Sequence, residues 1–167
     1  MADDTGANGA DANQANAGPT LAMVGQYIRD LSFENPQAPS SILAGGANPN
    51  FAFNIAVGYT KQSDEVYAVE TTLNVKADRD GAVLFNVELV YGGVFVLRNV
   101  PDAQAPFILM VQCPTQTFPF ARQVIANVIQ QGGFPPVLLQ PVDFNALFQQ
   151  RLQAAAAEIE RNRNLNA

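Results

Sequence analysis

A two-residue alternation from Phe51 to Thr60 is the feature that most constrains how this 167-residue chain can fold. Large apolar side chains occupy the odd positions, and small or polar ones occupy the even positions. Successive side chains of a strand point to opposite faces, so the segment predicts a β-strand with one apolar face that other elements must cover. The alternating residues are Phe51, Phe53, Ile55, Val57 and Tyr59 against Ala52, Asn54, Ala56, Gly58 and Thr60.

Three more segments predict strands, and short turns separate the last three strands. The first strand alternates clearly between Tyr27 and Glu34, with Arg29 as the exception. Turns this short imply an antiparallel meander. The additional strands are expected at 21–34, 66–77 and 83–97, and the turns at 61–64 and 78–81.

Glycine and proline mark two departures from regular pairing. Gly92 and Gly93 interrupt the fourth strand, where missing Cβ atoms permit either a bulge or the close approach of another backbone, and we expect the bulge. Segment 35–49 is rich in Pro, Gly and Ala, which block regular pairing. It therefore predicts a long crossover between the first and second strands.

Helical spacing replaces the alternation after Arg98. Pro119 suits the first position of a helix, Gly132 suits its C-terminal cap, and Asp143 suits the N-cap of a final helix. Apolar residues between Pro119 and Gly132 recur three and four residues apart, so this helix carries an apolar stripe that must pack on something. The stripe consists of Phe120, Val124, Ile125, Val128 and Ile129.

The loop at 132–141 carries apolar residues where polar ones are usual. It contains Phe134 and two leucines, although loops normally run over the surface. Packing against the core or a binding surface would each explain them, and the residues themselves leave both open.

Composition indicates a single domain with short tails. Residues 1–20 contain no large apolar side chain after Met1, which predicts a disordered N-terminal arm. The remainder is expected to form one domain at 21–160, followed by a frayed tail at 161–167.

Charge and residue counts exclude several classes of function. A net charge of -6 opposes binding to nucleic acid, because no basic patch is present. No apolar run of about 18 residues is available to span a bilayer, and the acidic N-terminus differs from a signal peptide. The single cysteine cannot form an internal disulfide, so a cytoplasmic location is expected.

Candidate catalytic residues are few. The chain has no histidine, which excludes Ser-His-Asp triads and histidine zinc sites. Cys113 lies among apolar residues and is expected to be inert. Glu70 and Glu88 share the parity of one strand face and are the candidate acid and base for an enzyme, an alternative that we rank lowest. No cofactor or metal site is expected.

Several strings at consistent spacing resemble SecB, a family of bacterial protein-export chaperones. The resemblance covers residues 27–148 in order. Its strings are YIRDLSFENP at 27–36, GGVF at 92–95, CP at 113–114, FPFAR at 118–122, GFP at 133–135 and LQPVDFNALF at 139–148.

The resemblance implies an ATP-independent holdase that keeps preproteins unfolded and delivers them to the SecA ATPase. It implies an α+β fold with a four-stranded antiparallel sheet, helices on one side, and a homotetramer built as a dimer of dimers. A holdase needs extended apolar grooves rather than a tight pocket, and the apolar residues of the loop at 132–141 fit that need. The main alternative is a SecB-like chaperone dedicated to one client, such as a toxin-antitoxin module.

The resemblance also assigns roles to particular residues. The peptide-binding groove maps to the crossover at 36–49, the second strand and the helix-connecting loop. The acidic patch that docks SecA maps to the exposed face of the sheet, and the tetramer contact maps to the helical stripe. The groove residues are Phe51, Phe53, Ile55, Phe134, Pro136 and Leu139; the docking residues are Asp30, Glu34 and Glu88; the interface residues are Phe120, Val124 and Val128.

Two positions depart from the family pattern. Asn86 stands where the family often has a leucine, two positions before the third acidic residue, and a Gly-Ala run at 44–47 replaces a tryptophan before the second strand. The first departure bears on SecA affinity and the second on the depth of the groove. The C-terminal segment 154–167 is the expected counterpart of a family tail that assists SecA contact.

Overall fold

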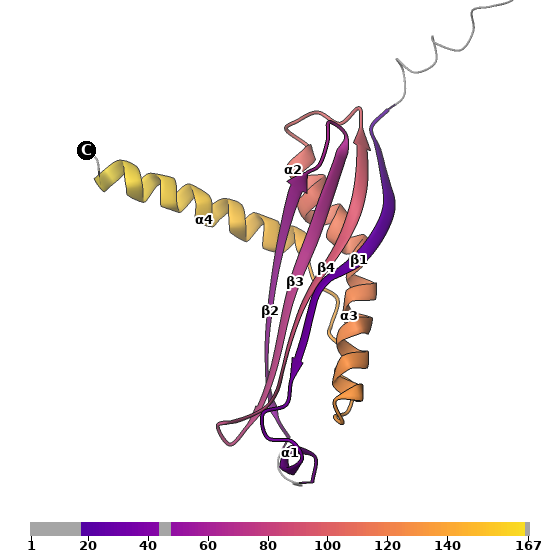
Figure 1. Cartoon of the computed structure of the whole chain (residues 1–167). Helices are drawn as coiled ribbons and strands as arrows, with labels where there is room; N and C mark the ends of the chain where they lie inside the picture. Colours follow the sequence, from indigo (N-terminus) through magenta and orange to yellow (C-terminus); the bar gives the residue numbers. More distant parts are fainter. Residues whose placement is uncertain (1–17, 44–47, 166–167) are drawn as a thin grey trace, which may run out of the picture.

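The computed structural model describes residues 18–43 and 48–165, and Figure 1 shows a twisted sheet with helices on one side. This α+β architecture confirms the expected fold class. The predicted arm at 1–20 falls mostly outside the described residues, as does the Gly-Ala run at 44–47. The elements are β1 (Thr20–Glu34), α1 (Ser40–Leu43), β2 (Asn50–Lys61), β3 (Val66–Arg79), β4 (Ala82–Arg98), α2 (Ala105–Phe107), a π-helix (Ile108–Gln112), α3 (Cys113–Gln131) and α4 (Phe144–Leu165).

All neighbouring strands are antiparallel, in the order β1-β4-β3-β2. Strands β2, β3 and β4 form the expected meander, and β1 and β2 lie at opposite edges. The segment after β1, which includes α1, therefore carries the chain from one edge of the sheet to the other. The turn between β3 and β4 is shorter than expected, because β3 extends to Arg79 and β4 begins at Ala82. Its two residues, Asp80 and Gly81, both have positive φ (51° and 81°), the geometry of a two-residue hairpin.

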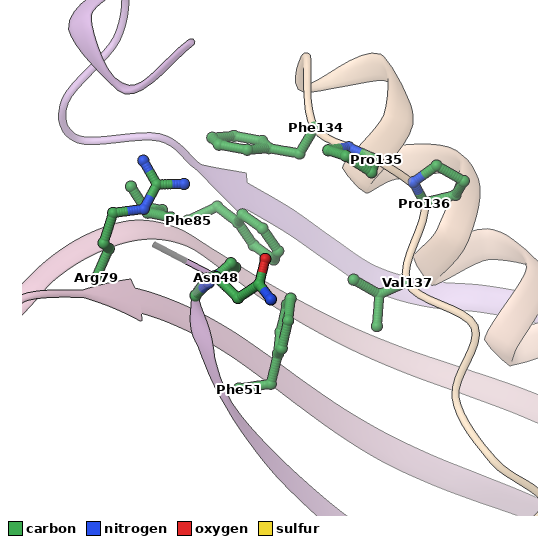
Figure 2. Close-up of a pocket in the computed structure, with 10 residues that line it drawn as sticks. Asn48, Phe51, Arg79, Phe85, Phe134, Pro135, Pro136 and Val137 are labelled. Atoms are coloured by element: carbon green, nitrogen blue, oxygen red, sulfur yellow. The ribbon is translucent and has the colours of Figure 1, made fainter. Parts of the chain in front are cut away.

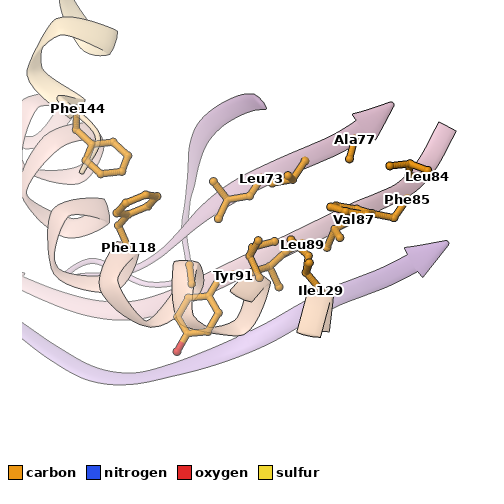
Figure 3. Close-up of a cluster of buried hydrophobic side chains, with 13 residues drawn as sticks. Leu73, Ala77, Leu84, Phe85, Val87, Leu89, Tyr91, Phe118, Ile129 and Phe144 are labelled. Carbon is orange, nitrogen blue, oxygen red and sulfur yellow. The ribbon is translucent and has the colours of Figure 1, made fainter. Parts of the chain in front are cut away.

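The inner face of the sheet packs against α3 and forms the main core (Figure 3). Leu73 pairs with Leu89, and Val75 with Val87, so the apolar residues of β3 and β4 share this face. Burial of these side chains against the helix is the dominant favourable contribution to folding. The helical residues of the cluster are Phe118, Ala121, Ile125 and Ile129 on α3 and Phe144 on α4.

Two irregularities in β1 explain why its alternation was imperfect. The pairing of β1 with β4 shifts between Met23 and Gly25 and again between Ile28 and Asp30. Arg29 is therefore an extra residue in a bulge, which reverses the phase of the side chains on either side.

Gly92 and Gly93 do not form the expected bulge, and this prediction was wrong. Both residues keep their register with β1 and with β3. The two glycines leave space for neighbouring rings. A Cβ on Gly92 would clash with the Tyr27 ring at 2.4 Å, and one on Gly93 would clash with the Phe95 ring at 2.6 Å. The structure therefore favours close approach, by side chains rather than by another backbone.

Pro119 does not begin the long helix, contrary to expectation. It lies inside α3, which starts at Cys113 and continues directly from the π-helix. A proline inside a helix costs about 3 kcal/mol. Here the turns before Pro119 bury Leu109, Cys113 and Phe118 against the sheet, and that burial outweighs the local cost.

The ends of the two long helices follow the sequence signals. Gly132 is the C-cap of α3, as expected, but the left-handed residue is Gly133 (φ 91°). The Phe134 amide donates to the Ile129 carbonyl at 3.2 Å, which completes a Schellman motif and turns the chain sharply into the loop. At α4, the Asp143 side chain caps the helix by accepting from the Ala146 amide at 2.9 Å.

The C-terminal part of α4 extends away from the sheet (Figure 1). Its side chains are exposed from Gln149 to Asn164, and its backbone stays helical to Leu165. Among the described residues, no helix is long and apolar enough to cross a membrane.

Substitution of Gly93 tests whether the missing Cβ matters for packing. We expect Gly93→Ala to lower the free energy of unfolding by about 1–3 kcal/mol, because the methyl group would press on Phe95 and on Thr117 of α3. Urea denaturation followed by circular dichroism measures the change. The matched control is Gly58→Ala, where a Cβ meets nothing within 4 Å, and equal stability of the two variants would contradict this account.

Candidate functional site

Phe85 is the residue around which the apolar end of the sheet is organised. Its ring centroid lies 6.0 Å from that of Phe33, 6.4 Å from that of Phe51 and 4.8 Å from that of Phe134. These three rings come from β1, β2 and the loop after α3. Aromatic pairs at such separations add to the stabilisation from burial alone, so Phe85 holds three distant segments together.

A bulge in β4 allows this arrangement. Ala77 pairs with Phe85, but the next residue of β3, Asp78, pairs with Val83. Leu84 is thus left without a partner in the ladder, and two consecutive large side chains, Leu84 and Phe85, are both buried.

A hollow of about 600 Å³ lies beside Phe85, between the sheet and the loop at 134–137 (Figure 2). Phe51 forms part of its wall and remains 52% exposed, so an apolar surface faces the solvent here. Concave apolar surfaces of this size are typical of binding sites. The lining residues are Asn48, Pro49, Phe51, Arg79, Leu84, Phe85, Phe134, Pro135, Pro136 and Val137.

The six groove residues expected from sequence fall around this hollow and its surroundings. Phe51, Phe134 and Pro136 line it directly. Phe53 follows Phe51 on the same face of β2 and is 42% exposed. Leu139 is half-buried against the core, which gives it a packing role.

Ile55 belongs to a second, smaller hollow of about 210 Å³ farther along β2. This hollow also contains Leu147 and Phe148 of α4. At its rim, Nη1 of Arg151 donates to the Val57 carbonyl at 3.0 Å. Helix α4 therefore satisfies a backbone acceptor of β2, which is an edge strand of the sheet.

The three acidic residues expected from sequence come together on the outer face of the sheet. Glu88 pairs with Ser32, and Asp30 and Glu34 lie two positions on either side of Ser32. Because diagonal neighbours on adjacent strands share a face, Glu88 lies roughly 7–8 Å from each of Asp30 and Glu34, which are themselves about 13 Å apart along β1. All three residues are exposed.

The carboxylates proposed for an enzyme do not form a catalytic pair. Glu70 pairs with Gly92, which lies four residues along β4 from Glu88. The Cα atoms of Glu70 and Glu88 are therefore about 13 Å apart. Glu70 is also engaged, because it forms an ion pair with Arg29 and accepts a hydrogen bond from the Tyr27 hydroxyl at 2.9 Å. Burial and then that hydrogen bond raise the pKa of Tyr27.

The chemistry of Cys113 agrees with the expectation that it is inert. The side chain is buried, and burial raises the pKa of its thiol to about 12. The thiol is therefore protonated at neutral pH, whereas the thiolate is the nucleophilic form.

The three residues expected at a subunit interface lie along one side of α3. Phe120 is 49% exposed, whereas Val124 and Val128 are half-buried at the margin of the core. The other members of the apolar stripe, Ile125 and Ile129, are buried against the sheet of the same chain. The stripe therefore divides between the core and an exposed margin.

Sequence reasoning missed Phe85, Leu84 and Arg79 as lining residues. The alternation of β4 placed Phe85 among ordinary strand residues, and no residue type marks the bulge at Leu84. Arg79 was assigned to a turn, whereas the structure places it at the end of β3.

Comparison with known sequences identifies the family. Residues 14–155 match the family model described as "SecB: Preprotein translocase subunit SecB". The protein-export protein SecB of Bartonella bacilliformis is 45% identical over 148 residues, which cover 89% of this chain and 93% of that protein. That of Mesorhizobium japonicum is 46% identical over 151 residues, with 90% of each chain covered.

The fold also matches a solved structure. A SecB-like chaperone from Mycobacterium tuberculosis, solved in complex with a ChAD peptide from the HigA1 antitoxin, superposes with a TM-score of 0.58. The match covers 73% of this chain and 90% of that chain at 8% sequence identity, a level that supports the fold alone. Family match, close relatives and fold agree, and the chain belongs to the SecB family of protein-export proteins.

Proposed function

We propose that this protein is an ATP-independent holdase that keeps preproteins unfolded in the cytoplasm and delivers them to the SecA ATPase. The observation that carries the proposal is the solvent-exposed apolar surface around the hollow beside Phe85. Large contiguous apolar patches are rare on the surfaces of soluble proteins and usually mark interaction sites. Its family of protein-export proteins makes unfolded preproteins the natural ligand.

The groove suits a ligand without a fixed sequence. Phe51, Phe53 and the Pro135–Pro136 segment supply apolar contacts with modest demands on shape. Strand β2 lies at the edge of the sheet, so its free backbone groups are available to an extended client strand except where Arg151 occupies the Val57 carbonyl. Main-chain hydrogen bonding plus apolar contacts is the general means of binding extended peptides.

We further propose a homotetramer built as a dimer of dimers. Strand β1 is the other edge strand, it is 15 residues long, and it exposes Val24 and Ile28. Long apolar edges pair readily with another chain. Phe120 on α3 supplies a second apolar surface, so one chain presents two surfaces for self-association.

For SecA docking we propose the acidic cluster of Asp30, Glu34 and Glu88. The cluster lies on the outer face, opposite the face that carries the groove residues. Clustered carboxylates favour a basic partner surface and accelerate its association. A client could therefore stay bound while SecA docks.

Removal of one aromatic groove residue tests the holdase role. We expect the wild-type protein to suppress aggregation of a denatured preprotein without ATP. We expect Phe51→Ala to weaken client binding about fivefold or more, because truncation of a hot-spot residue at an interface costs more than about 1 kcal/mol. Light scattering and peptide anisotropy measure the two effects.

The control is Ile159→Ala, which removes an apolar side chain 70% exposed on the extended part of α4. Unchanged aggregation at a molar excess of wild-type protein would refute the proposal. Capture of one dominant client with no SecA would instead support a chaperone dedicated to a single client, as the antitoxin-peptide complex of the solved relative suggests.

The docking cluster is tested separately. We expect Asp30→Asn with Glu88→Gln to weaken SecA binding several-fold at low salt, because two charges facing a basic surface are lost, while aggregation suppression is unchanged. Surface plasmon resonance at increasing salt measures the effect. The control is Asp64→Asn in the distant β2–β3 turn, and loss of aggregation suppression in the double variant would indicate misfolding instead.

Assembly has its own test. We expect light scattering to give about four chains per particle, and Phe120→Asp to shift the particle to a smaller size, because a charge would replace an apolar contact. Gln123→Asp, an exposed position on the same helix, serves as the control. A wild-type protein that is monomeric at micromolar concentration would contradict the proposal.

A further inference from the structure

One row of residues joins three strands on the outer face of the sheet. Gly92 of β4 pairs with Tyr27 of β1 on one side and with Glu70 of β3 on the other. Tyr27 and Glu70 are therefore two strands apart, with Cα atoms about 10 Å from each other. Because Gly92 has no Cβ, the Tyr27 ring can cross β4 at this point. Its hydroxyl then donates to Oε1 of Glu70 at 2.9 Å.

Arg29 reaches the same carboxylate from the next turn of the chain. It is the extra residue of the bulge between Ile28 and Asp30, and its Nη1 atom donates to Oε2 of Glu70. The two oxygens of one carboxylate thus hold β1 both before the bulge and at it. The side chain of Glu70 is 23% exposed and that of Arg29 is 65% exposed, so the carboxylate is the better shielded partner. We refer to Tyr27, Arg29 and Glu70 as the Glu70 bridge.

The bulge decides which way Asp30 points. Tyr27 and Asp30 both lie on the outer face, because they pair with Gly92 and Val90, although they are three residues apart in the chain. A regular strand would place residues three apart on opposite faces. The extra residue at the bulge changes the phase, and this change directs the Asp30 carboxylate to the outer face.

Apolar packing within the chain holds the bulge only loosely. The inner-facing residues on either side of it, Ile28 and Leu31, remain 48% and 38% exposed. Farther along β1, Phe33 packs against the main core and fixes the direction of its neighbour Glu34. Asp30 adjoins the bulge instead, so its direction depends on what holds the bulge on the outer face.

We propose that Glu70 is a positioning residue for SecA docking, because it holds Tyr27 and Arg29 and thereby fixes the bulge that directs the Asp30 carboxylate. The inference rests on the docking function proposed for the acidic cluster that contains Asp30. The effect of Glu70 passes through the backbone of β1, since its own charge is already paired with Arg29.

The sign of one substitution separates positioning from simple charge. Arg29→Met removes a positive charge beside the acidic cluster, so by charge alone a basic partner would bind more tightly. Loss of the bridge acts in the opposite direction, because Asp30 is no longer held in place and must be ordered when the partner binds. Tyr27→Phe also breaks the bridge, and it leaves every charge unchanged.

Surface plasmon resonance with the full-length protein and purified SecA, at about 0.15 M salt, tests the proposal. We expect Arg29→Met to weaken SecA binding about threefold and Tyr27→Phe to weaken it about twofold, which is the range of one exposed ion pair. Arg29→Lys keeps the ion pair and should restore most of the affinity. The matched control is Arg98→Met, which removes the same charge at the far end of β4, where Arg98 pairs with Glu65 at 2.8 Å. It should bind SecA as tightly as the wild-type protein or more tightly.

A second measurement reports on the bulge without any partner. We expect hydrogen exchange of the amides at 28–31 to be faster in Arg29→Met and in Tyr27→Phe, whereas exchange at Phe33 and Glu34 is unchanged. Aggregation suppression and the particle mass from light scattering should equal those of the wild-type protein, because the groove and the apolar surfaces are untouched.

The outcomes separate this inference from the function on which it rests. If Arg29→Met binds SecA as tightly as Arg98→Met does, the role of Glu70 is refuted and the acidic cluster remains the docking site. Weaker binding with unchanged exchange at 28–31 also refutes it, as does weaker binding that accompanies a smaller particle. Failure of the wild-type protein to bind SecA contradicts both proposals.

Discussion

Burial of the inner face of the sheet beneath α3 is the interaction on which the rest of the molecule depends. Helix α3 packs its Ile125 and Ile129 against the central strands β3 and β4. One helical layer covers the centre of this face, so the edge strand β2 keeps Phe51 and Phe53 exposed on the same face. The apolar groove is thus the part of the core-forming surface that no helix within residues 18–43 and 48–165 covers.

Phe85 gives that exposed surface a rigid base. It contacts rings from β1, β2 and the loop after α3, and it is itself only 2% exposed. The Schellman motif at Gly133 directs Phe134 back onto Phe85, so the cap that ends α3 also places the far wall of the groove. A firm base with exposed aromatic rims suits ligands that share apolar character but no sequence.

The two faces of the sheet separate two kinds of chemistry. Apolar groove residues occupy the inner face, and the carboxylates of Asp30, Glu34 and Glu88 occupy the outer face. Strand alternation assigns each side chain to one face, so the apolar and the acidic surfaces coexist on the same strands without mixing. This separation supports the proposed transfer of a client to SecA, because the acidic surface stays accessible while the groove is filled.

Sequence alone indicated the strands, the crossover, both helix caps, the inert Cys113 and the family, because these depend on local periodicity or on strings of adjacent residues. Alternation also placed Asp30 and Glu34 on one face of the first strand, and the family resemblance added Glu88 to them. Sequence reasoning failed at Pro119, where tertiary burial outweighed a local helix preference, and at Gly92 and Gly93, where the reason for glycine lies in side chains of other elements.

Only the tertiary structure decided which residues meet in the groove. The register of β3 and β4, shifted by the bulge at Leu84, brings Phe85 beside Phe51 and Phe134 and places Arg79 on the groove side. Sequence periodicity determined which side chains share a face, because each strand or helix sets that locally. Contacts among residues far apart in the chain depend instead on how the elements pack, a property of the whole core that no local pattern encodes.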